Sequence, residues 1–139
     1  AYFKTYRNND AIDACLQALR INPNIDDAWS IIGRVYIDLN RYNEALEAFS
    51  QTLRINPDHI RAWYDLGVSL YRLNRYDDAI EAYLRALRIN PEYADVWNNL
   101  GIAYFISGNR TAALETVKEL RRLDPARADK LFEAITMQQ

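Results

Sequence analysis

Apolar side chains in the middle of the chain recur at the spacing of an amphipathic helix. Trp63, Leu66 and Leu70 stand at positions i, i+3 and i+7. After a short polar segment, Tyr76 and Ile80 begin a second run with the same spacing. Because a helix completes a turn about every 3.6 residues, each run places its apolar side chains on one face. The pattern therefore predicts two helices, each with one apolar face.

The same pattern returns along the chain with a period of 34 residues. The residues that mark the period are the prolines Pro23, Pro57, Pro91 and Pro125, the tryptophans Trp29, Trp63 and Trp97, the glycines Gly33, Gly67 and Gly101, and the alanines Ala11, Ala45, Ala79 and Ala113. Self-similarity at a fixed spacing of this length is typical of repeat proteins, in which each unit packs on its neighbours. We therefore predict an all-α fold, an α-solenoid of antiparallel helix hairpins.

Small residues mark the predicted turns and helix contacts. Asn40, Asn74 and Gly108 stand between the two helices of successive units, and these residue types tolerate the left-handed conformation of a tight turn. Gly67 and Ala79 share the period, which places them where the two helices of a hairpin approach most closely. A larger side chain there would force the helices apart. The glycines form no glycine-rich loop, which argues against a phosphate site.

Composition narrows the functional classes. The chain of 139 residues carries 17 basic and 19 acidic side chains, for a net charge of −2. This balance argues against a protein that binds nucleic acid through its phosphates. Half of the residues are hydrophobic, as in a folded domain, and no apolar run has membrane-spanning length, so we expect no membrane insertion. The chain has no secretory signal pattern.

Candidate chemistry is scarce. Cys15 is the one cysteine and His59 the one histidine, so the sequence offers no disulfide framework and no metal-ligand spacing. No nucleophile, base and acid occur together, and we expect no catalytic residue, no cofactor and no metal. Cys15 falls at the position of Phe49 and Tyr83, which predicts a small core residue. His59 follows Pro57, and we expect it to be an exposed loop residue.

Three segments of the second unit resemble the signature of the tetratricopeptide repeat family. They are residues 62–67 (AWYDLG), 76–83 (YDDAIEAY) and 86–91 (ALRINP). The period also matches that of the family. The resemblance implies a right-handed superhelix of hairpins, with the first helices lining a concave surface that binds a peptide or a partner helix.

The resemblance divides the chain into five parts. They are a partial repeat at residues 1–25, repeats at 26–59, 60–93 and 94–127, and a C-terminal capping helix at 128–139. Residues 1–25 match a repeat only from its tenth position, so we expect the chain to begin inside a first helix, with upstream sequence missing or removed. Ile135 stands where a further repeat would have glycine, which favours a cap over another repeat.

The resemblance also predicts which side chains line the concave surface. They are Asp27, Ser30, Arg34, Ile37, Asp38, Arg61, Tyr64, Val68, Tyr71, Arg72, Asp95, Asn98, Ile102, Phe105 and Ile106. Their charges are mixed, so the groove does not select strongly for an acidic or a basic ligand. Ile37, Tyr71 and Phe105 recur at the repeat spacing, either as a contact site for a partner or as packing against the adjacent first helix. Both interpretations stay open.

Two ligand types known in the family do not fit these positions. The clamp that holds chaperone C-termini needs lysine and asparagine where this chain has Ser30 and Arg34. It also needs asparagine where this chain has Asp65, a carboxylate that would repel the ligand. An asparagine ladder at the sixth position of the repeats is mostly absent, because Ile31 and Asp65 precede Asn99 there.

We predict a non-catalytic interaction module that binds a peptide or helix of a partner protein in its concave groove. One alternative is a self-assembling scaffold, because the helix face formed by Ile12, Cys15, Leu16 and Leu19 would be open at the N-terminal end. Another is a segment that recruits substrates for a larger protein. We expect no nucleic-acid partner. A single cysteine fits the cytoplasm, the default compartment, and also the periplasm.

Overall fold

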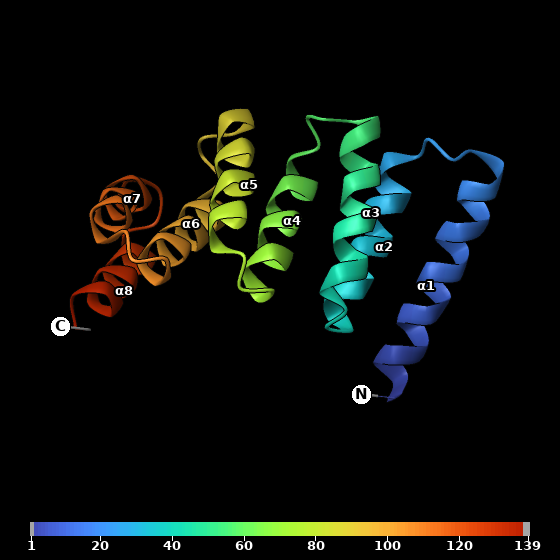
Figure 1. Ribbon diagram of the computed structural model, residues 1–139, viewed down its shortest axis with the longest axis horizontal. Helices are drawn as coiled ribbons and strands as arrows, with labels where there is room; N and C mark the ends of the chain where they lie inside the picture. Colours follow the sequence, from blue (N-terminus) through green and yellow to red (C-terminus); the bar gives the residue numbers. More distant parts are fainter. Residues whose placement is uncertain (1, 138–139) are drawn as a thin grey trace.

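The computed structural model describes residues 2–137, with side chains from residue 7 onward, and these residues form eight helices and no strand (Figure 1). The helices are α1 (Tyr2–Ile21), α2 (Asp26–Asp38), α3 (Tyr42–Ile55), α4 (Ile60–Arg72), α5 (Tyr76–Ile89), α6 (Ala94–Ile106), α7 (Arg110–Leu123) and α8 (Pro125–Thr136). The hairpins follow one another from the N-terminal to the C-terminal end of the molecule, and α8 lies beside α7 at the C-terminal end. The predicted all-α solenoid is confirmed.

Helices pair as hairpins, and each hairpin packs its second helix on the first helix of the next hairpin. The pairs α2–α3, α4–α5 and α6–α7 pack most extensively. The first helices also approach one another, since α2 contacts α4 and α4 contacts α6, whereas no Cα atoms of α3 and α5 lie within 8 Å of each other in the described chain. Because first helices lie close together and second helices spread apart, α2, α4 and α6 line the inner side of the stack.

The hairpin turns use the residues that the sequence singles out. Asn40 and Asn74 have φ angles of 58° and 62°, and Gly108 has a φ angle of 93°. After the first two turns, the amides of Arg41 and Arg75 donate back to the carbonyls of Tyr36 and Leu70. These bonds satisfy carbonyls that the end of a helix would leave free.

Each tryptophan ties its helix to the preceding loop. The indole Nε1 of Trp63 donates to the carbonyl of Pro57 at 2.8 Å, and that of Trp97 donates to Pro91 at 2.7 Å. Trp29 makes the same bond, at 3.1 Å, to the carbonyl of Pro23. Proline and tryptophan therefore share the repeat period because they form one contact between neighbouring hairpins.

The periodic glycines lie under rings of the second helix. A Cβ atom on Gly33 would stand 2.6 Å from the ring of Phe49, and one on Gly67 would overlap the ring of Tyr83. Both rings are almost completely buried. The prediction that small residues mark the closest approach within a hairpin is confirmed, and the side chain facing Gly67 is Tyr83.

In the third hairpin, a residue of α8 takes the place of the ring that covers the glycine in the other two. Its second helix has Val117 where the other hairpins have a ring, so the space beside Gly101 is left open. Leu131 of α8 fills that space, with its Cδ2 atom 2.7 Å from where a Cβ atom on Gly101 would be. Ile135 is buried in the same cluster, together with Val117 and Leu120. Helix α8 therefore covers the last hairpin and completes its core.

Helix α1 differs from what the partial repeat implied. The alignment of residues 1–25 with later repeats requires the end of one helix, a turn and a second helix, but α1 continues unbroken from Tyr2 to Ile21. The position equivalent to Asn40 and Asn74 is Tyr6. Tyrosine disfavours the left-handed conformation of that turn, so nothing in the sequence stops the helix.

The N-terminal apolar face is mostly covered, which corrects its description as open. Cys15 and Leu19 are buried against Ala28 and Ile32 of α2. On the predicted face, Leu16 is the exposed member. The prediction that Cys15 is a core residue is confirmed. Among the described residues, no helix combines the length and the apolar character needed to cross a membrane.

Candidate binding groove

Two neighbouring cavities lie along the inner helices. The first, of about 340 Å³, is lined by Ile31, Arg34, Val35, Ile37 and Asp38 of α2 and by Arg61 and Asp65 of α4. The second, of about 220 Å³, is lined by Val68, Tyr71 and Arg72 of α4, Tyr83 of α5, and Asn99 and Ile102 of α6. We call the series of inner-helix side chains along these cavities the groove, the first cavity the α2–α4 cavity and the second the α4–α6 cavity.

A buried carboxylate organises the α2–α4 cavity. Asp65 is 4% exposed. Its Oδ2 atom accepts from Nε of Arg61 at 3.1 Å, and Nε of Arg34 lies 4.0 Å from the same oxygen. Burial raises the pKa of the Asp65 carboxyl, and the two guanidinium groups only partly oppose this effect. The two arginines are thus held in place by a charge that lies beneath the groove surface.

This cluster was not predicted from the sequence, where Asp65 only marked departures from two ligand patterns of the family. The spacing of Arg61 and Asp65, four residues apart on one helix, was a visible signal of an ion pair. The approach of Arg34 was not visible, because it depends on how α2 packs against α4.

Aromatic side chains connect the two cavities. The ring of Tyr64 stacks on that of Tyr93 with 5.5 Å between centroids, and the guanidinium of Arg61 lies 5.4 Å from the Tyr64 centroid. The hydroxyl of Tyr64 accepts from Nδ2 of Asn99 at 3.3 Å. Burial raises the pKa of the Tyr64 phenol, so it stays protonated at neutral pH. Asn99 therefore links α6 to the aromatic cluster of α4.

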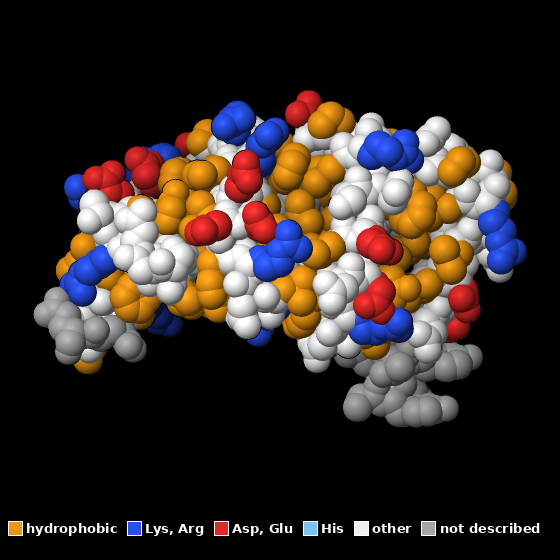
Figure 2. Space-filling view, in the orientation of Figure 1, with side chains coloured by type: hydrophobic (Ala, Val, Ile, Leu, Met, Phe, Trp, Pro, Cys, Tyr) orange, Lys and Arg blue, Asp and Glu red, His pale blue; other side chains and the backbone are white. Residues whose placement is uncertain are grey.

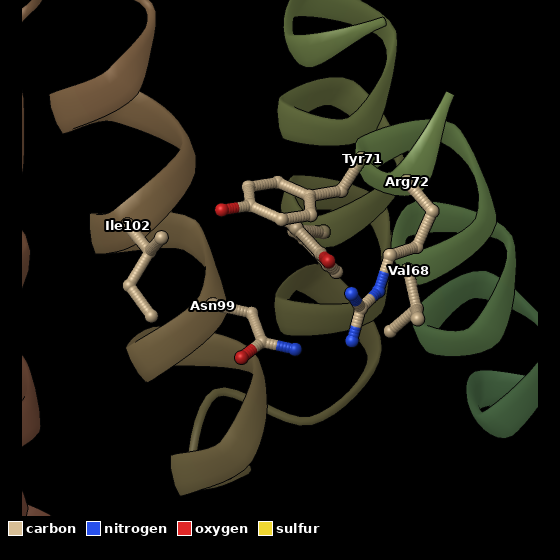
Figure 3. A pocket seen from close by; sticks show the side chains of 6 residues that line it. Val68, Tyr71, Arg72, Asn99 and Ile102 are labelled. Carbon is tan, nitrogen blue, oxygen red and sulfur yellow. The ribbon is translucent and has the colours of Figure 1, made fainter. Parts of the chain in front are cut away.

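The α4–α6 cavity combines apolar walls with polar groups (Figure 3). Val68 and Ile102 stand on opposite helices, and the ring of Tyr71 extends from α4 towards α6. The amide of Asn99 and the guanidinium of Arg72 face each other across the space between the helices. Tyr71 is fixed by edge-on packing against Tyr76, with 5.4 Å between ring centroids.

Several predicted groove charges are already paired within the chain. Asp95 accepts from Arg127 of α8, and Asp27 pairs with His59 at 3.0 Å. Arg72 and Asp38 have no ion-pair partner among the described residues. The groove is therefore less densely charged towards a ligand than its sequence suggests.

The structure removes one predicted residue from the groove surface. Ser30 is 5% exposed, because it lies inside the stack of hairpins, so its hydroxyl is not available to a ligand. Asp27, Arg34, Asp38, Arg61, Arg72, Asp95 and Ile106 are exposed, and Ile37, Tyr64, Val68, Tyr71, Asn98, Ile102 and Phe105 are half-buried.

The apolar stripe both packs and faces the groove. Ile37, Tyr71 and Phe105 each contact a core cluster and remain partly exposed. Ile37 and Tyr71 also line the two cavities. The two interpretations of this stripe are therefore compatible for Ile37 and Tyr71.

His59 is not the exposed loop residue that we expected. Its side chain is 13% exposed, and its Nδ1 atom accepts from the amide of Ala62 as the cap of α4. The remaining ring proton is then on Nε2, which donates to Asp27. This arrangement joins two hairpins, because Asp27 belongs to α2.

Asp26, Asp27 and His59 come close enough to hold a metal ion, but their hydrogen bonds already explain the cluster. Asp26 accepts from Nδ2 of Asn56 at 3.0 Å. A metal on Nε2 of His59 would move the ring proton to Nδ1 and remove the acceptor for Ala62. We therefore interpret the cluster as a structural contact between repeats.

The charge distribution also bears on ligand class. Figure 2 shows acidic and basic side chains interspersed with apolar ones over the visible face, with no broad region of a single sign. This mixture agrees with the small net charge of the sequence.

Comparison with protein families gives a clear match. The family model described as Tetratricopeptide repeat matches residues 32–94 and again residues 64–128. No curated protein matches this chain.

Solved structures with the same fold are similar over most of their length. One crystal structure of MamA matches with a TM-score of 0.82 and 23% identity, over 94% of this chain and 87% of that chain. A second MamA crystal structure matches with a TM-score of 0.86 and 26% identity, over 93% and 72%. The TPR2B domain of yeast Sti1, in a complex with pHsp70, matches with a TM-score of 0.77 and 18% identity, over 82% and 98%.

Proposed function

The chain belongs to the tetratricopeptide repeat family, and from this premise we propose that it is a non-catalytic module that binds a peptide or helix of a partner protein. The proposed binding surface is the groove along α2, α4 and α6. The observation that carries the proposal is the pair of adjacent cavities, each lined by side chains of two successive inner helices. A ligand laid along the groove could fill both cavities at once.

The residue types in the groove suit protein recognition. Tyr71, Arg61 and Arg72 belong to the types that contribute most to binding at protein interfaces. Apolar neighbours such as Ile37 and Val68 supply area that a ligand can cover. The hairpin fold holds these side chains on packed helices, so little ordering is needed when a ligand binds.

The Sti1 domain in its complex with pHsp70 has the same fold, but we do not transfer that ligand to this chain. Ser30 is buried, and Asp65 already engages the two arginines of the α2–α4 cavity. A ligand carboxylate would have to compete with Asp65 for these arginines. We therefore propose a partner segment whose affinity comes from several small contacts.

A double substitution tests the groove. Tyr71→Ala with Arg72→Glu removes a ring from the α4–α6 cavity and reverses the charge beside it. We expect affinity for a partner protein to fall by about tenfold or more, because a central aromatic and an arginine are lost together. Calorimetry with the purified partner measures the change, and thermal unfolding checks that the array still folds.

The matched control is Leu84→Ala with Arg88→Glu on α5. Leu84 and Arg88 are exposed outside the groove, and Arg88, like Arg72, lies in the last turn of its helix. The two variants therefore carry the same change in charge and a similar effect on a helix end. Unchanged affinity in the Tyr71 and Arg72 variant would contradict the proposed groove.

A further inference from the structure

The α4–α6 cavity is lined by a buried polar residue, Tyr83, that has no part in the contacts described so far for the groove surface. Tyr83 lines the cavity although only 1% of the residue is exposed. Its ring covers Gly67, and burial raises the pKa of its phenol, which stays protonated at neutral pH. Asn99 lines the same cavity, so both a phenol-bearing and an amide-bearing residue contribute to its wall.

The inner part of this cavity is therefore polar. Asn99 donates to the hydroxyl of Tyr64 at 3.3 Å, and it lines the cavity together with Tyr83. The distance to Tyr64 is long for such a bond. An amide has two donors and an acceptor with two lone pairs, so this arrangement leaves hydrogen-bonding capacity on Asn99 and Tyr83 unused.

The size of the cavity limits what can enter. Its volume is about 220 Å³. An engineered apolar cavity of about 150 Å³ in another protein binds benzene, so this space holds one aromatic ring with a substituent. The walls formed by Val68, Tyr71 and Ile102 are apolar or aromatic and suit the faces of such a ring.

Charge at the rim limits what can lie beside the ring. Arg72 lines the cavity, is exposed, and has no ion-pair partner among the described residues. A basic ligand residue next to the cavity would be repelled by this guanidinium, and an acidic one would be attracted. Arginine offers a planar set of donors that fits a carboxylate.

We propose that the α4–α6 cavity receives a tyrosine side chain of the partner segment, and that an acidic residue next to this tyrosine pairs with Arg72. The phenol ring lies between Val68 and Ile102, and its hydroxyl reaches the polar inner part formed by Asn99 and Tyr83. This inference rests on the proposed function, since it names the chemistry of the segment that occupies the groove.

Phenylalanine and aliphatic side chains fit the walls but not the inner part. Each would bury the amide of Asn99 and the hydroxyl of Tyr83 away from water without a new partner. Lysine and arginine bring a cation towards Arg72. Tyrosine is the side chain that combines an aromatic body with a hydroxyl that both donates and accepts.

Blocked tripeptides provide the test. The probes are acetyl-Glu-Tyr-Glu-amide, the same peptide with phenylalanine in the centre, and the same peptide with lysine on both sides. Titration of the isotope-labelled full chain by NMR follows the side-chain amide of Asn99 and the backbone amides of α4 and α6. We expect the phenylalanine probe to bind about tenfold more weakly, for loss of the buried hydroxyl contacts. We expect the lysine probe to bind more weakly than the glutamate probe by about threefold or more.

A further probe identifies the source of the carboxylate. N-acetyltyrosine carries a carboxylate only at its end, whereas the blocked tripeptide carries carboxylates only on side chains. Tighter binding of the tripeptide supports an acidic side chain beside the tyrosine. Tighter binding of N-acetyltyrosine overturns that part of the proposal and assigns Arg72 to a chain terminus.

Variants separate the two contacts. Tyr83→Phe and Asn99→Leu should each reduce the preference for tyrosine over phenylalanine, while Arg72→Gln should reduce only the preference for acidic over basic flanks. Tyr76→Phe is the matched control, because its hydroxyl donates to Asn74 outside the cavity. A merely structural role for Tyr83 would weaken both probes alike and leave their ratio unchanged.

Equal affinity for the tyrosine and phenylalanine probes, or shifts confined to other helices, overturns the inference. If partner binding is nevertheless lost in the Tyr71 and Arg72 variant, the proposed function stands and only the identity of the side chain is wrong. If that variant keeps partner binding, the proposed groove itself fails, whatever the probes show.

Discussion

At the scale of single residues, the sequence gives type and spacing but not the partner across the next helix. Cys15 was correctly predicted to be buried because its repeat position is apolar in other units. The burial of His59 was not predicted, because its two contacts join the start of α4 to Asp27 of the preceding hairpin. The burial of Asp65 was not predicted, and aspartate is rarely buried without partners. Its partners are Arg61 and Arg34, and only one of them is local in sequence.

Asp65 leads to a prediction on the pH dependence of stability. Its folded pKa is raised above the unfolded value, chiefly by burial, so the folded state holds this proton more tightly. The contribution of Asp65 to stability is therefore lost as pH rises from its unfolded pKa through its raised folded pKa. Asp65→Asn removes the titration. We expect the unfolding free energy of the variant, minus that of the wild type, to increase as pH rises from about 4 to 7.

Urea unfolding at several pH values measures this difference. The wild-type chain contains other acids with the opposite behaviour, such as Asp26, whose pKa is lowered by its bond from Asn56. Subtracting the two chains cancels those contributions. A difference that decreases as pH rises would mean that Arg61 and Arg34 lower the pKa of Asp65 by more than burial raises it.

At the scale of elements, helices and turns follow from local chemistry. Asn40, Asn74 and Gly108 adopt positive φ angles at the predicted turns because their residue types tolerate them. Helix α1 obeys the same rule in reverse, since Tyr6 takes the place of the turn residue and the helix continues. The division of residues 1–25 by family alignment overlooked this single position.

Glycine packing gives a prediction at this scale. Gly67→Ala should carry a packing cost of about 1–3 kcal/mol, because the new methyl group meets the rigid, buried ring of Tyr83. The higher helix propensity of alanine offsets about 1 kcal/mol of this cost, so we expect a net loss of stability of up to about 2 kcal/mol. Denaturant unfolding measures it.

Gly101→Ala is the comparison for this change. There the new methyl group meets the flexible end of Leu131, which can move aside, so the loss of stability should be smaller. Equal losses at the two glycines would show that the ring of Tyr83 yields as easily as a leucine.

At the scale of the molecule, each hairpin depends on its neighbour. In the N-terminal part, α2 covers the face of Cys15 and Leu19, and at the other end α8 supplies Leu131 to the third hairpin. In a linear array of this kind, stability is approximately a sum of hairpin and interface contributions. A weakened α8 should therefore act mainly on the hairpin next to it.

Leu131→Ala tests this view of the cap. The substitution leaves a cavity beside Gly101 and should cost about 2–5 kcal/mol. Hydrogen exchange should accelerate in α6, α7 and α8 more than in α2 and α3. The neighbouring Phe132→Ala is the control, since Phe132 is 43% exposed and its removal should have little effect. Uniform acceleration over all helices would contradict independent behaviour of the two ends.

The sequence by itself determined the repeat period, the helices, the turns and the family, because these depend on residue type and spacing within one unit. Some side chains that it predicted for the concave surface, such as Arg34, Tyr71 and Ile102, line the two cavities, and their part in binding stays a prediction. The tertiary structure alone decided that Ser30 is buried, that Arg34 reaches Asp65, and that Asn99 and Tyr83 line one cavity. Each of these depends on how one helix packs on another, and that packing is set by the shapes of side chains distant in sequence.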